Sequence, residues 1–538
     1  MIFQASFYKS KKLLLIEDCE PVRASIKGML QQIGFDDITA VADAMQAVSP
    51  AKRHSFDFIL ADFNLGDGKD ALQLFNELSA LGAIKTACCF VLMSTEPQRL
   101  PVFGVLQGTP DHFVLKPFSY VELEKRLAKA WQNRTALRKV YQAIKQTDLA
   151  SALQELDEAI KAGSANALQA LRLKGELLLA QGEYNAAAQL YSKIQQQRDF
   201  SWARLGAAVT MVKLQQWADA EQALLQLAEQ DDIRPEAVEW LARCYLLQAD
   251  LVKAQEQLTE LLKLQPTHIA AHYALADVLQ LNGQQEDSSR YLQKLIQQFR
   301  FSAFDAPECY LQLSRLLLEQ AQHAELGAFT AALKKSSEAL ASMPQKLTTD
   351  VIEPELAVLR ARISLLQGNV ADAKQQLNLI TVATKPVHVA AEQDKARLAF
   401  ALGDTKQAEA HLALLKSADF AADDLSGCCQ RLLAKQAVLR ETELRAQLRD
   451  LNQAGMDAAQ KGNVKVALVK LRQAFLLMPC NAGLALNLLQ VLSQLPAHKA
   501  LLPLAKAVLS ALENTSVTSA NQQRLAQLLP QLPELYLD

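Results

Sequence analysis

The stretch FDFILADFNLGDG, residues 56–68, places a carboxylate directly after an apolar run. Residues 58–61 have the length and the side chains of a buried strand, and Asp62 follows them at once. The glycines just beyond it favour a turn. A charge at the end of an apolar strand is costly unless polar partners compensate for it. We therefore expect the rest of the chain to supply partners for Asp62.

Five apolar runs of this kind occur within the first 132 residues, and helical patterns separate them. The runs are LLLI at 13–16, ITAV at 38–41, FILA at 58–61, FVLM at 90–93 and HFVL at 112–115. Short strands that alternate with helices are typical of a doubly wound α/β fold, here with a five-stranded parallel sheet. In such a sheet, the groups that follow the strands meet along one edge.

Polar side chains follow four of these predicted strands. They are Glu17 and Asp18 after the first strand, Asp62 after the third, Ser94 and Thr95 after the fourth, and Lys116 after the fifth. The three carboxylates could hold Mg²⁺, which prefers carboxylate and water oxygens. Asp62 is then the candidate nucleophile for a phosphoryl group, and Lys116 would neutralise part of the incoming negative charge.

In this order, the motifs resemble the receiver domain of two-component response regulators, a flavodoxin-like fold. The resemblance covers roughly residues 10–130 and is carried by IED at 16–18, the strand-end Asp62, MST at 93–95 and LKPF at 115–118. It implies that Asp62 is the phosphoacceptor. It also implies roles for other residues: Mg²⁺ binding by Glu17, Asp18, Asp62 and the main-chain carbonyl of Asn64, a switch hydroxyl on Thr95, a rotating aromatic ring at Phe113, and phosphate contact by Lys116.

The sequence departs from this family pattern at two places. Gly66 stands where the family commonly has a proline four residues after its aspartate, and Glu96 and Pro97 follow Thr95 in place of a small residue. The first departure bears on the register of the loop after Asp62, and the second bears on access to a phosphoryl group at Asp62.

Beyond residue 132, the strand-like runs stop and an internal repeat begins. Small residues recur every 33–35 residues, at Ala152, Ala187, Ala220, Ala254 and Ser288. A period near 34 indicates tandem pairs of helices, and these segments resemble tetratricopeptide repeats. The resemblance implies an all-α superhelical solenoid over residues 133–538, with about eight repeats, two of them irregular, and terminal helices that cover the last apolar face.

The spacing loosens after residue 300. Residues 307–344 have the length of an expanded repeat, and residues 422–460 fit one long or broken helix pair. The segments GNVADAKQQL (368–377), GDTKQAEAHL (403–412) and GNVKVALVKL (462–471) restore the motif.

The resemblance also implies a partner-binding groove, lined by the first helix of each repeat. Carried onto this sequence, the groove positions are Arg172, Glu176, Trp202, Lys213, Glu239, Arg243, Tyr273 and Asp277. Aromatic side chains among charged ones can anchor a peptide or a helix. Trp202 and Tyr273 are the stronger candidates, because exposed large aromatic side chains more often have a use.

Composition and the absence of certain motifs exclude some classes of function. The net charge is −2, so we do not expect nucleic acid as a ligand. HIAAH (268–272) lacks the glutamate of a zinc protease, and GDGKD (66–70) lacks the Ser/Thr of a phosphate-binding loop, so we expect no enzyme.

The N-terminus carries neither a signal peptide nor a spanning helix, and the eight cysteines lack CxxC spacing. We therefore expect a cytoplasmic protein without membrane insertion.

Together these patterns predict a response regulator whose output is protein binding. A sensor histidine kinase or a phosphotransfer protein would phosphorylate Asp62, and the helical array would bind a protein partner that the sequence does not name. The last receiver helix, about 119–132 and running on toward 145, would join the two parts. One alternative stays open: a constitutive scaffold or enzyme adaptor whose receiver serves docking or homodimerisation.

Overall fold

The computed structural model describes residues 3–65, 71–95, 110–163, 166–300, 305–378, 388–515 and 518–536. Its internal contacts divide the chain into two compact units. The first contains Met1–Gln248 and Glu256–His268, and the second contains Ala249–Gln255, Ile269–Arg300 and Asp305–Asp538. Within the described ranges, no helix has both the length and the apolar character needed to cross a bilayer.

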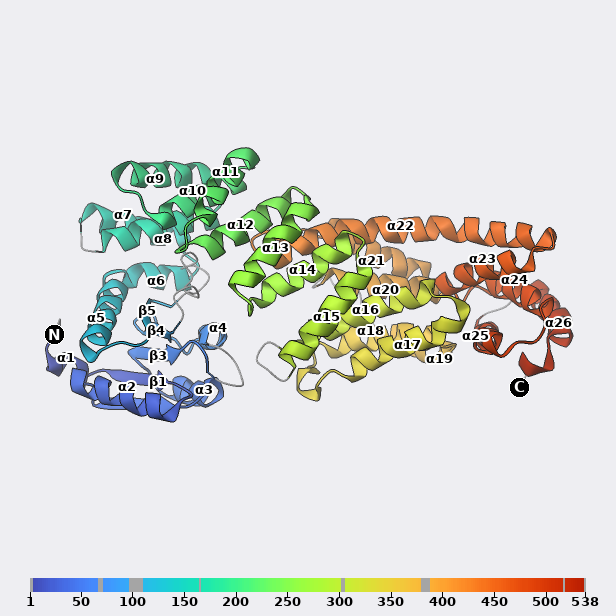
Figure 1. Ribbon diagram of the computed structural model, residues 1–538, viewed down its shortest axis with the longest axis horizontal. Coiled ribbons are helices and arrows are strands. Elements are labelled where there is room, and N and C mark those ends of the chain that lie inside the picture. Colours follow the sequence, from blue (N-terminus) through green and yellow to red (C-terminus); the bar gives the residue numbers. More distant parts are fainter. Residues whose placement is uncertain are drawn as a thin grey trace. The chain divides into compact units, whose positions relative to one another are not determined.

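The first unit begins with a five-stranded parallel sheet (Figure 1). Its strands are β1 (Lys12–Ile16), β2 (Asp37–Val41), β3 (Phe58–Asp62), β4 (Cys89–Ser94) and β5 (His112–Leu115). They lie in the order β2-β1-β3-β4-β5, which is a doubly wound topology. The predicted fold class is confirmed, and each observed strand contains the apolar run that predicted it.

Helices cover both faces of the sheet, so the side chains of one strand alternate between two apolar layers. These helices are α1 (Ala5–Lys9), α2 (Glu20–Ile33), α3 (Ala44–Arg53), α4 (Ala71–Ala80) and α5 (Tyr120–Ala136). Leu13 and Leu15 of β1 pack in a layer with α2 and α5. Leu14 and Ile16 pack in the other layer, with α3 and α4. Burial on both faces explains why the strands are continuous apolar runs in the sequence.

A short break separates the last helix of the α/β domain from the first helix of the array. α5 ends at Ala136, and α6 (Arg138–Lys145) begins after Leu137, whose φ of −101° and ψ of 18° leave the helical region. Leu137 is buried in an apolar cluster with residues of α7 and α8, which accounts for the change of direction. The helix predicted to run on toward 145 is therefore interrupted once. The boundary predicted at residue 132 falls inside α5 and stays a prediction.

The rest of the first unit consists of helices joined by short turns. They are α7 (Leu149–Lys161), α8 (Ala167–Ala180), α9 (Tyr184–Gln197), α10 (Ser201–Lys213), α11 (Trp217–Ala228) and α12 (Arg234–Leu247), while α13 (Leu251–Leu264) has residues in both units. The small residues that revealed the repeat are buried: Ala152, Ala187 and Ala220 have no exposed surface. Small side chains at these positions let neighbouring helices approach closely.

Two glycines make room for a tyrosine between three of these helices. Tyr191 on α9 is fully buried. A Cβ atom on Gly175 of α8 would lie 2.4 Å from its hydroxyl oxygen, and a Cβ atom on Gly206 of α10 would lie 2.3 Å from its ring carbon Cζ. Both distances are far below contact distance, so the Tyr191 ring fits only because the two glycines have no side chain.

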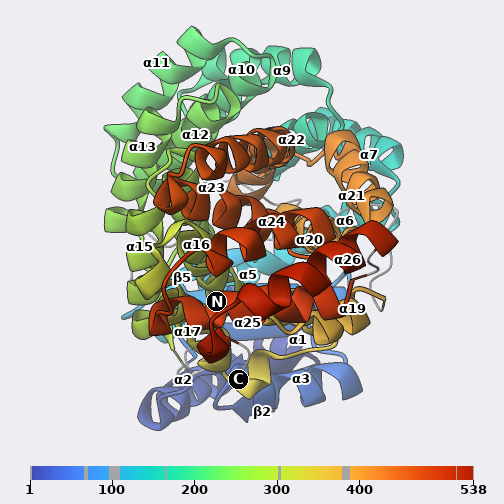
Figure 2. The same ribbon diagram turned by 90° about the vertical axis from the view of Figure 1, so that its right-hand side faces the viewer.

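The second unit is helical throughout its described part (Figure 2). Its helices are α14 (Ile269–Leu281), α15 (Gln285–Phe299), α16 (Pro307–His323), α17 (Leu326–Ala341), α18 (Glu353–Leu366), α19 (Val370–Asn378), α20 (Val389–Ala401), α21 (Thr405–Ser417), α22 (Leu425–Gln460), α23 (Val464–Leu477), α24 (Ala482–Ser493), α25 (Leu502–Glu513) and α26 (Ser519–Leu528). α16 and α17 have 17 and 16 residues, against 13 and 15 in α14 and α15. α22 is one continuous helix of 36 residues, so a single long helix replaces the helix pair expected at 422–460.

Replacing Gly206 by Ala should destabilise the array, because the new methyl group would overlap the ring of Tyr191. We expect a loss of about 1–3 kcal/mol in the free energy of unfolding, typical of an overpacked core. Urea unfolding followed by circular dichroism would measure it.

The matched control is Gly28→Ala on α2, where an added Cβ would have no atom within 4 Å. That change should be neutral or stabilise the helix by up to about 1 kcal/mol. If Gly206→Ala unfolded at the same urea concentration as the wild type, the packing of Tyr191 described above would be wrong.

Candidate functional site

The strand ends bring four of the predicted site residues together. Asp62 is the last residue of β3, and Glu17 follows β1. Lys116 follows β5, and its main-chain N–H donates to the carbonyl of Ser94, with 2.8 Å between nitrogen and oxygen. The backbone thus fixes the base of Lys116 to the end of β4.

The ammonium group of Lys116 lies between the buried carboxylate of Glu17 and the half-buried carboxylate of Asp62. Its Nζ is 2.7 Å from Oε2 of Glu17 and 2.8 Å from Oδ1 of Asp62. Glu17 is only 2% exposed, whereas Asp18 beside it is exposed. Oxygens of the three carboxylates lie within 4.8 Å of one another. Three acids and one base therefore share this edge of the sheet.

Burial and charge act against each other in this cluster. Burial raises the pKa of Asp62, and although the hydrogen bond and ion pair with Lys116 lower it, the pKa remains above its usual value. The pKa of Glu17 is raised for the same main reason. Burial lowers the pKa of Lys116, but its bonds to Asp62 and Glu17 raise it by more. The lysine therefore stays charged, and it neutralises only part of the negative charge of the two carboxylates.

Arg23 holds the backbone of the turn that carries Glu17 and Asp18. This role was not predicted from the sequence. This residue lies in the first turns of α2, and its Nη1 donates to the carbonyl of Glu17 at 2.6 Å and to that of Asp18 at 3.2 Å. These contacts fix the backbone that presents both acids. The available signal was a basic residue five positions after an acidic pair, which is too common to be noticed.

The remaining receiver positions lie around this cluster. Thr95 is exposed just after β4, and Asn64 is exposed two residues after Asp62. Phe113 on β5 is half-buried against the layer formed with α3 and α4. Gly66, Glu96 and Pro97, where the sequence departs from the family pattern, lie outside the described residues.

The eight predicted groove positions are divided between the two units. Arg172, Glu176, Trp202, Lys213, Glu239 and Arg243 belong to the first, and Tyr273 and Asp277 belong to the second. In the first unit, Arg172 forms an ion pair with Glu176 at 3.4 Å, and Arg243 forms one with Glu239. Lys213 is half-buried at the end of α10. The ring of Trp202 stacks on that of Phe200, with 5.7 Å between the ring centres.

The two positions in the second unit are also partly enclosed. Tyr273 is half-buried, and burial raises the pKa of its hydroxyl. Asp277 is buried and accepts a hydrogen bond of 2.7 Å from Nε2 of Gln312. Burial raises the pKa of Asp277 to about 7.

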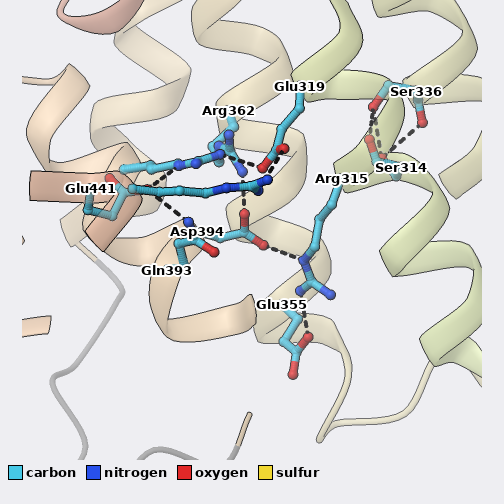
Figure 3. A network of polar contacts seen from close by, with 11 residues as sticks. Ser314, Arg315, Glu319, Ser336, Glu355, Arg362, Gln393, Asp394 and Glu441 are labelled. Atoms are coloured by element: carbon cyan, nitrogen blue, oxygen red, sulfur yellow. Dashed lines mark hydrogen bonds and ion pairs between the residues drawn. The ribbon is translucent and has the colours of Figure 1, made fainter. Parts of the chain in front are cut away.

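A network of buried charges in the second unit was not predicted (Figure 3). Arg315 on α16 contacts Asp394 on α20 at 2.6 Å and Glu355 on α18 at 2.9 Å. Arg362 on α18 also pairs with Asp394. The network ties α16, α18 and α20 together.

The same network extends from α20 to α22. Arg397 on α20 contacts Glu319 on α16 at 2.7 Å and also pairs with Glu441 on α22. Burial lowers the pKa of Arg397, but the two carboxylates raise it by more. Because each of these arginines has a carboxylate partner, we interpret the network as structural.

Comparisons with known proteins match the α/β part of the chain and part of the helical region that follows it. Residues 13–128 match the model of the response regulator receiver domain, and residues 137–201 and 178–244 match two models of the tetratricopeptide repeat. The chain is 24% identical over 129 residues to chemotaxis protein CheY-3 of Vibrio cholerae, which covers 24% of this chain and 98% of the relative. It is 24% identical over 121 residues to chemotaxis protein CheY of Pseudomonas aeruginosa, which covers 22% and 96%.

Two solved structures are similar to parts of this chain. The receiver domain of sensor histidine kinase PA1611 from Pseudomonas aeruginosa, solved with a magnesium ion in its active site cleft, is 27% identical over 22% of this chain and 96% of that chain, with a TM-score of 0.20. The APC/C hetero-tetramer Cut9-Hcn1 is 14% identical over 77% of this chain and 86% of that chain, with a TM-score of 0.44.

Replacing Asp62 by Asn should stabilise the receiver at neutral pH. The pKa of Asp62 is raised in the folded state, so folding favours its protonated form, and the ionised form costs stability above the usual pKa of 3.8. Asn is neutral at every pH, so the gain should be present at pH 7 and should shrink as the pH falls toward that value. A gain of about 1 kcal/mol would raise the melting temperature by about 4 °C in calorimetry.

Asp36→Asn is the control, because Asp36 is exposed and lies away from the cluster at the turn before β2. It should change the melting temperature little. A destabilised Asp62→Asn variant at pH 7 would show that Lys116 compensates fully for the carboxylate.

Proposed function

Because residues 13–128 are a response regulator receiver domain and residues 137–244 are tetratricopeptide repeats, we propose that this protein is a response regulator that is phosphorylated on Asp62 and acts by binding another protein. The observation that carries the proposal is the ammonium of Lys116, placed 2.8 Å from Asp62 within a cluster of three carboxylates. A sensor histidine kinase or a phosphotransfer protein is the proposed donor.

The donor set of the acidic cluster fits Mg²⁺, because it offers the hard carboxylate oxygens that this ion prefers. Glu17, Asp18 and Asp62 would hold the ion, and the main-chain carbonyl of Asn64 is a further proposed ligand. When bound, Mg²⁺ neutralises negative charge on the transferring phosphoryl group.

The side chains of the site have separate proposed roles in the transfer. A carboxylate oxygen of Asp62 forms a bond to phosphorus while the phosphorus–nitrogen bond of a phosphohistidine donor breaks. Lys116 then exchanges its contact with Asp62 for one with a phosphoryl oxygen. Thr95 and Phe113 are the proposed switch residues. Thr95 lies just after β4, and Phe113 lies on β5, the strand that ends next to Lys116.

Hydrogen bonds join strands β4 and β5 at both ends. They support the proposal that a conformational change at the site is transmitted to the helical array. At the carboxyl end, the N–H of Lys116 donates to Ser94. At the amino end, Asp111 accepts from the N–H of Phe90 at 2.8 Å. Asp111 also pairs with Arg134 of α5 at 2.9 Å. The guanidinium of Arg134 in turn lies 4.0 Å from the ring of Tyr141 on α6.

Phosphorylation itself is the first test. Incubation with Mg²⁺ and a small phosphodonor should label the protein with one acid-stable, base-labile acyl phosphate, and Asp62→Ala should abolish the label. Lys116→Ala should keep some label but lose most of the conformational response, because the lysine contacts the phosphate and is not the nucleophile. Asp18→Asn should weaken Mg²⁺ binding at least tenfold in calorimetry. Equal labelling of the Asp62→Ala variant would refute the assignment.

Partner binding is the second test, and it separates the regulator from the constitutive scaffold. Pull-downs with and without beryllofluoride should recover a partner in different amounts, and the difference should disappear in Asp62→Ala. Recovery that beryllofluoride does not change would favour the scaffold.

Substituting Trp202 and Tyr273 by Ala should weaken partner binding without changing the phosphorylation of Asp62. Unchanged affinity would place the groove elsewhere.

A further inference from the structure

Arg472 in the second unit is a buried cation that forms no ion pair with a described residue. It lies on α23 and is 8% exposed. Its Nη1 donates to the main-chain carbonyl of Ala324 at 3.0 Å, and its guanidinium lies 5.0 Å from the ring of Phe329. Among the residues that the structure describes, no carboxylate forms an ion pair with it, and its Nη2 has no hydrogen-bond partner. Burial lowers the pKa of Arg472.

The other buried arginines of the same unit differ in having carboxylate partners. Arg315 and Arg362 each contact at least one carboxylate, as does the half-buried Arg397, although Nη2 of Arg362 also has no hydrogen-bond partner among the described residues. A buried charge without a partner costs several kcal/mol, so native structures rarely keep one that has no use. Ala324 follows the C-terminus of α16, whose carbonyls offer Arg472 a partial negative charge. That contact leaves Nη2 unsatisfied.

Arg472 lines a cavity of about 120 Å³ whose wall is otherwise mostly apolar. The wall is formed by Leu333 of α17, Leu366 of α18, Phe475 of α23 and Leu504 of α25. Thr330 and Gln367 also line it and are exposed, which places its opening on their side. An apolar cavity of roughly 150 Å³ accommodates benzene, so this one has room for a single isobutyl or phenyl group.

We propose that this cavity binds one branched-aliphatic or aromatic group that carries a carboxylate, with the carboxylate on Arg472. A guanidinium binds a carboxylate through parallel N–H donors, and Arg472, which lines the cavity, forms no ion pair with a described carboxylate. A phosphate would bring about two negative charges to one cation within an apolar wall, so a monoanion fits better. The ligand is either a free acid or the C-terminal residue of a polypeptide. This site does not depend on the phosphorylation of Asp62.

Thermal shift and calorimetry on the full chain test the proposal. The probes are 4-methylpentanoate and phenylacetate, their uncharged amides, and a short peptide that ends in leucine with either a free carboxylate or an amide. We expect the acids to bind and to raise the melting temperature, and each amide to bind at least tenfold more weakly. Tighter binding of the peptide acid would identify a polypeptide C-terminus as the source. Tighter binding of the free acid would identify a small molecule.

Two variants locate the site. Arg472→Met should reduce acid binding at least tenfold and leave the melting temperature without ligand equal or higher, because it removes an uncompensated charge. Leu333→Phe should reduce binding by filling the cavity while Arg472 stays in place. Arg290→Met, on an exposed residue of the same unit, should bind the acids like the wild type.

Three outcomes would overturn the proposal. One is a wild-type protein that binds none of the acids. Another is equal binding of acids and amides. The third is an Arg472→Met variant that melts lower than the wild type and still binds the acids, which would leave Arg472 as a cap of α16 alone.

Discussion

The ammonium of Lys116 between Asp62 and Glu17 is the interaction on which the receiver site depends. Parallel strands bring both carboxylates to one edge of the sheet, where burial raises the pKa of each. Without a cation between them, two ionised carboxylates this close would repel one another in a poorly solvated site. The topology places β3 between β1 and β4, so the edge that gathers the acids also lies within reach of the residue after β5. Fold and site therefore follow from the same strand order.

The direction of the pKa shifts separates structural ion pairs from candidate reactive groups. Burial raises the pKa of Asp394, but Arg315 and Arg362 lower it by more, so this carboxylate is held firmly ionised. The pKa of Glu319 is lowered in the same way by Arg397 and Arg440. For Asp62, one lysine shared with Glu17 does not overcome burial. A stable helical array needs the charge of each buried carboxylate to be fully neutralised. A carboxylate whose charge is only partly neutralised can still interact with a metal ion or a phosphoryl group.

Sequence reasoning succeeded where local pattern and topology determine the result. The strands were predictable because burial on both faces makes each one an apolar run, and the acidic cluster was predictable because parallel strands share one edge. The network around Arg397 was not, because Glu319 lies 78 positions away and no local period pairs the two residues. The break at Leu137 was missed as well, since it depends on burial against α7 and α8 and no glycine or proline marks it. The groove positions came from repeat counting, which gives the face of a helix but not its ion pairs.

Unequal charge marks both of the proposed ligand sites, and its sign predicts the charge of the ligand. At the edge of the sheet, three carboxylates face one ammonium, so a cation completes the site. In the cavity beside α23, one guanidinium faces no carboxylate, so an anion completes it. In the network around Asp394 and Arg397, arginine and carboxylate side chains pair directly, which leaves far less charge for a ligand to balance. Because unpaired buried charge is costly, we interpret its persistence at these two places as a sign of binding.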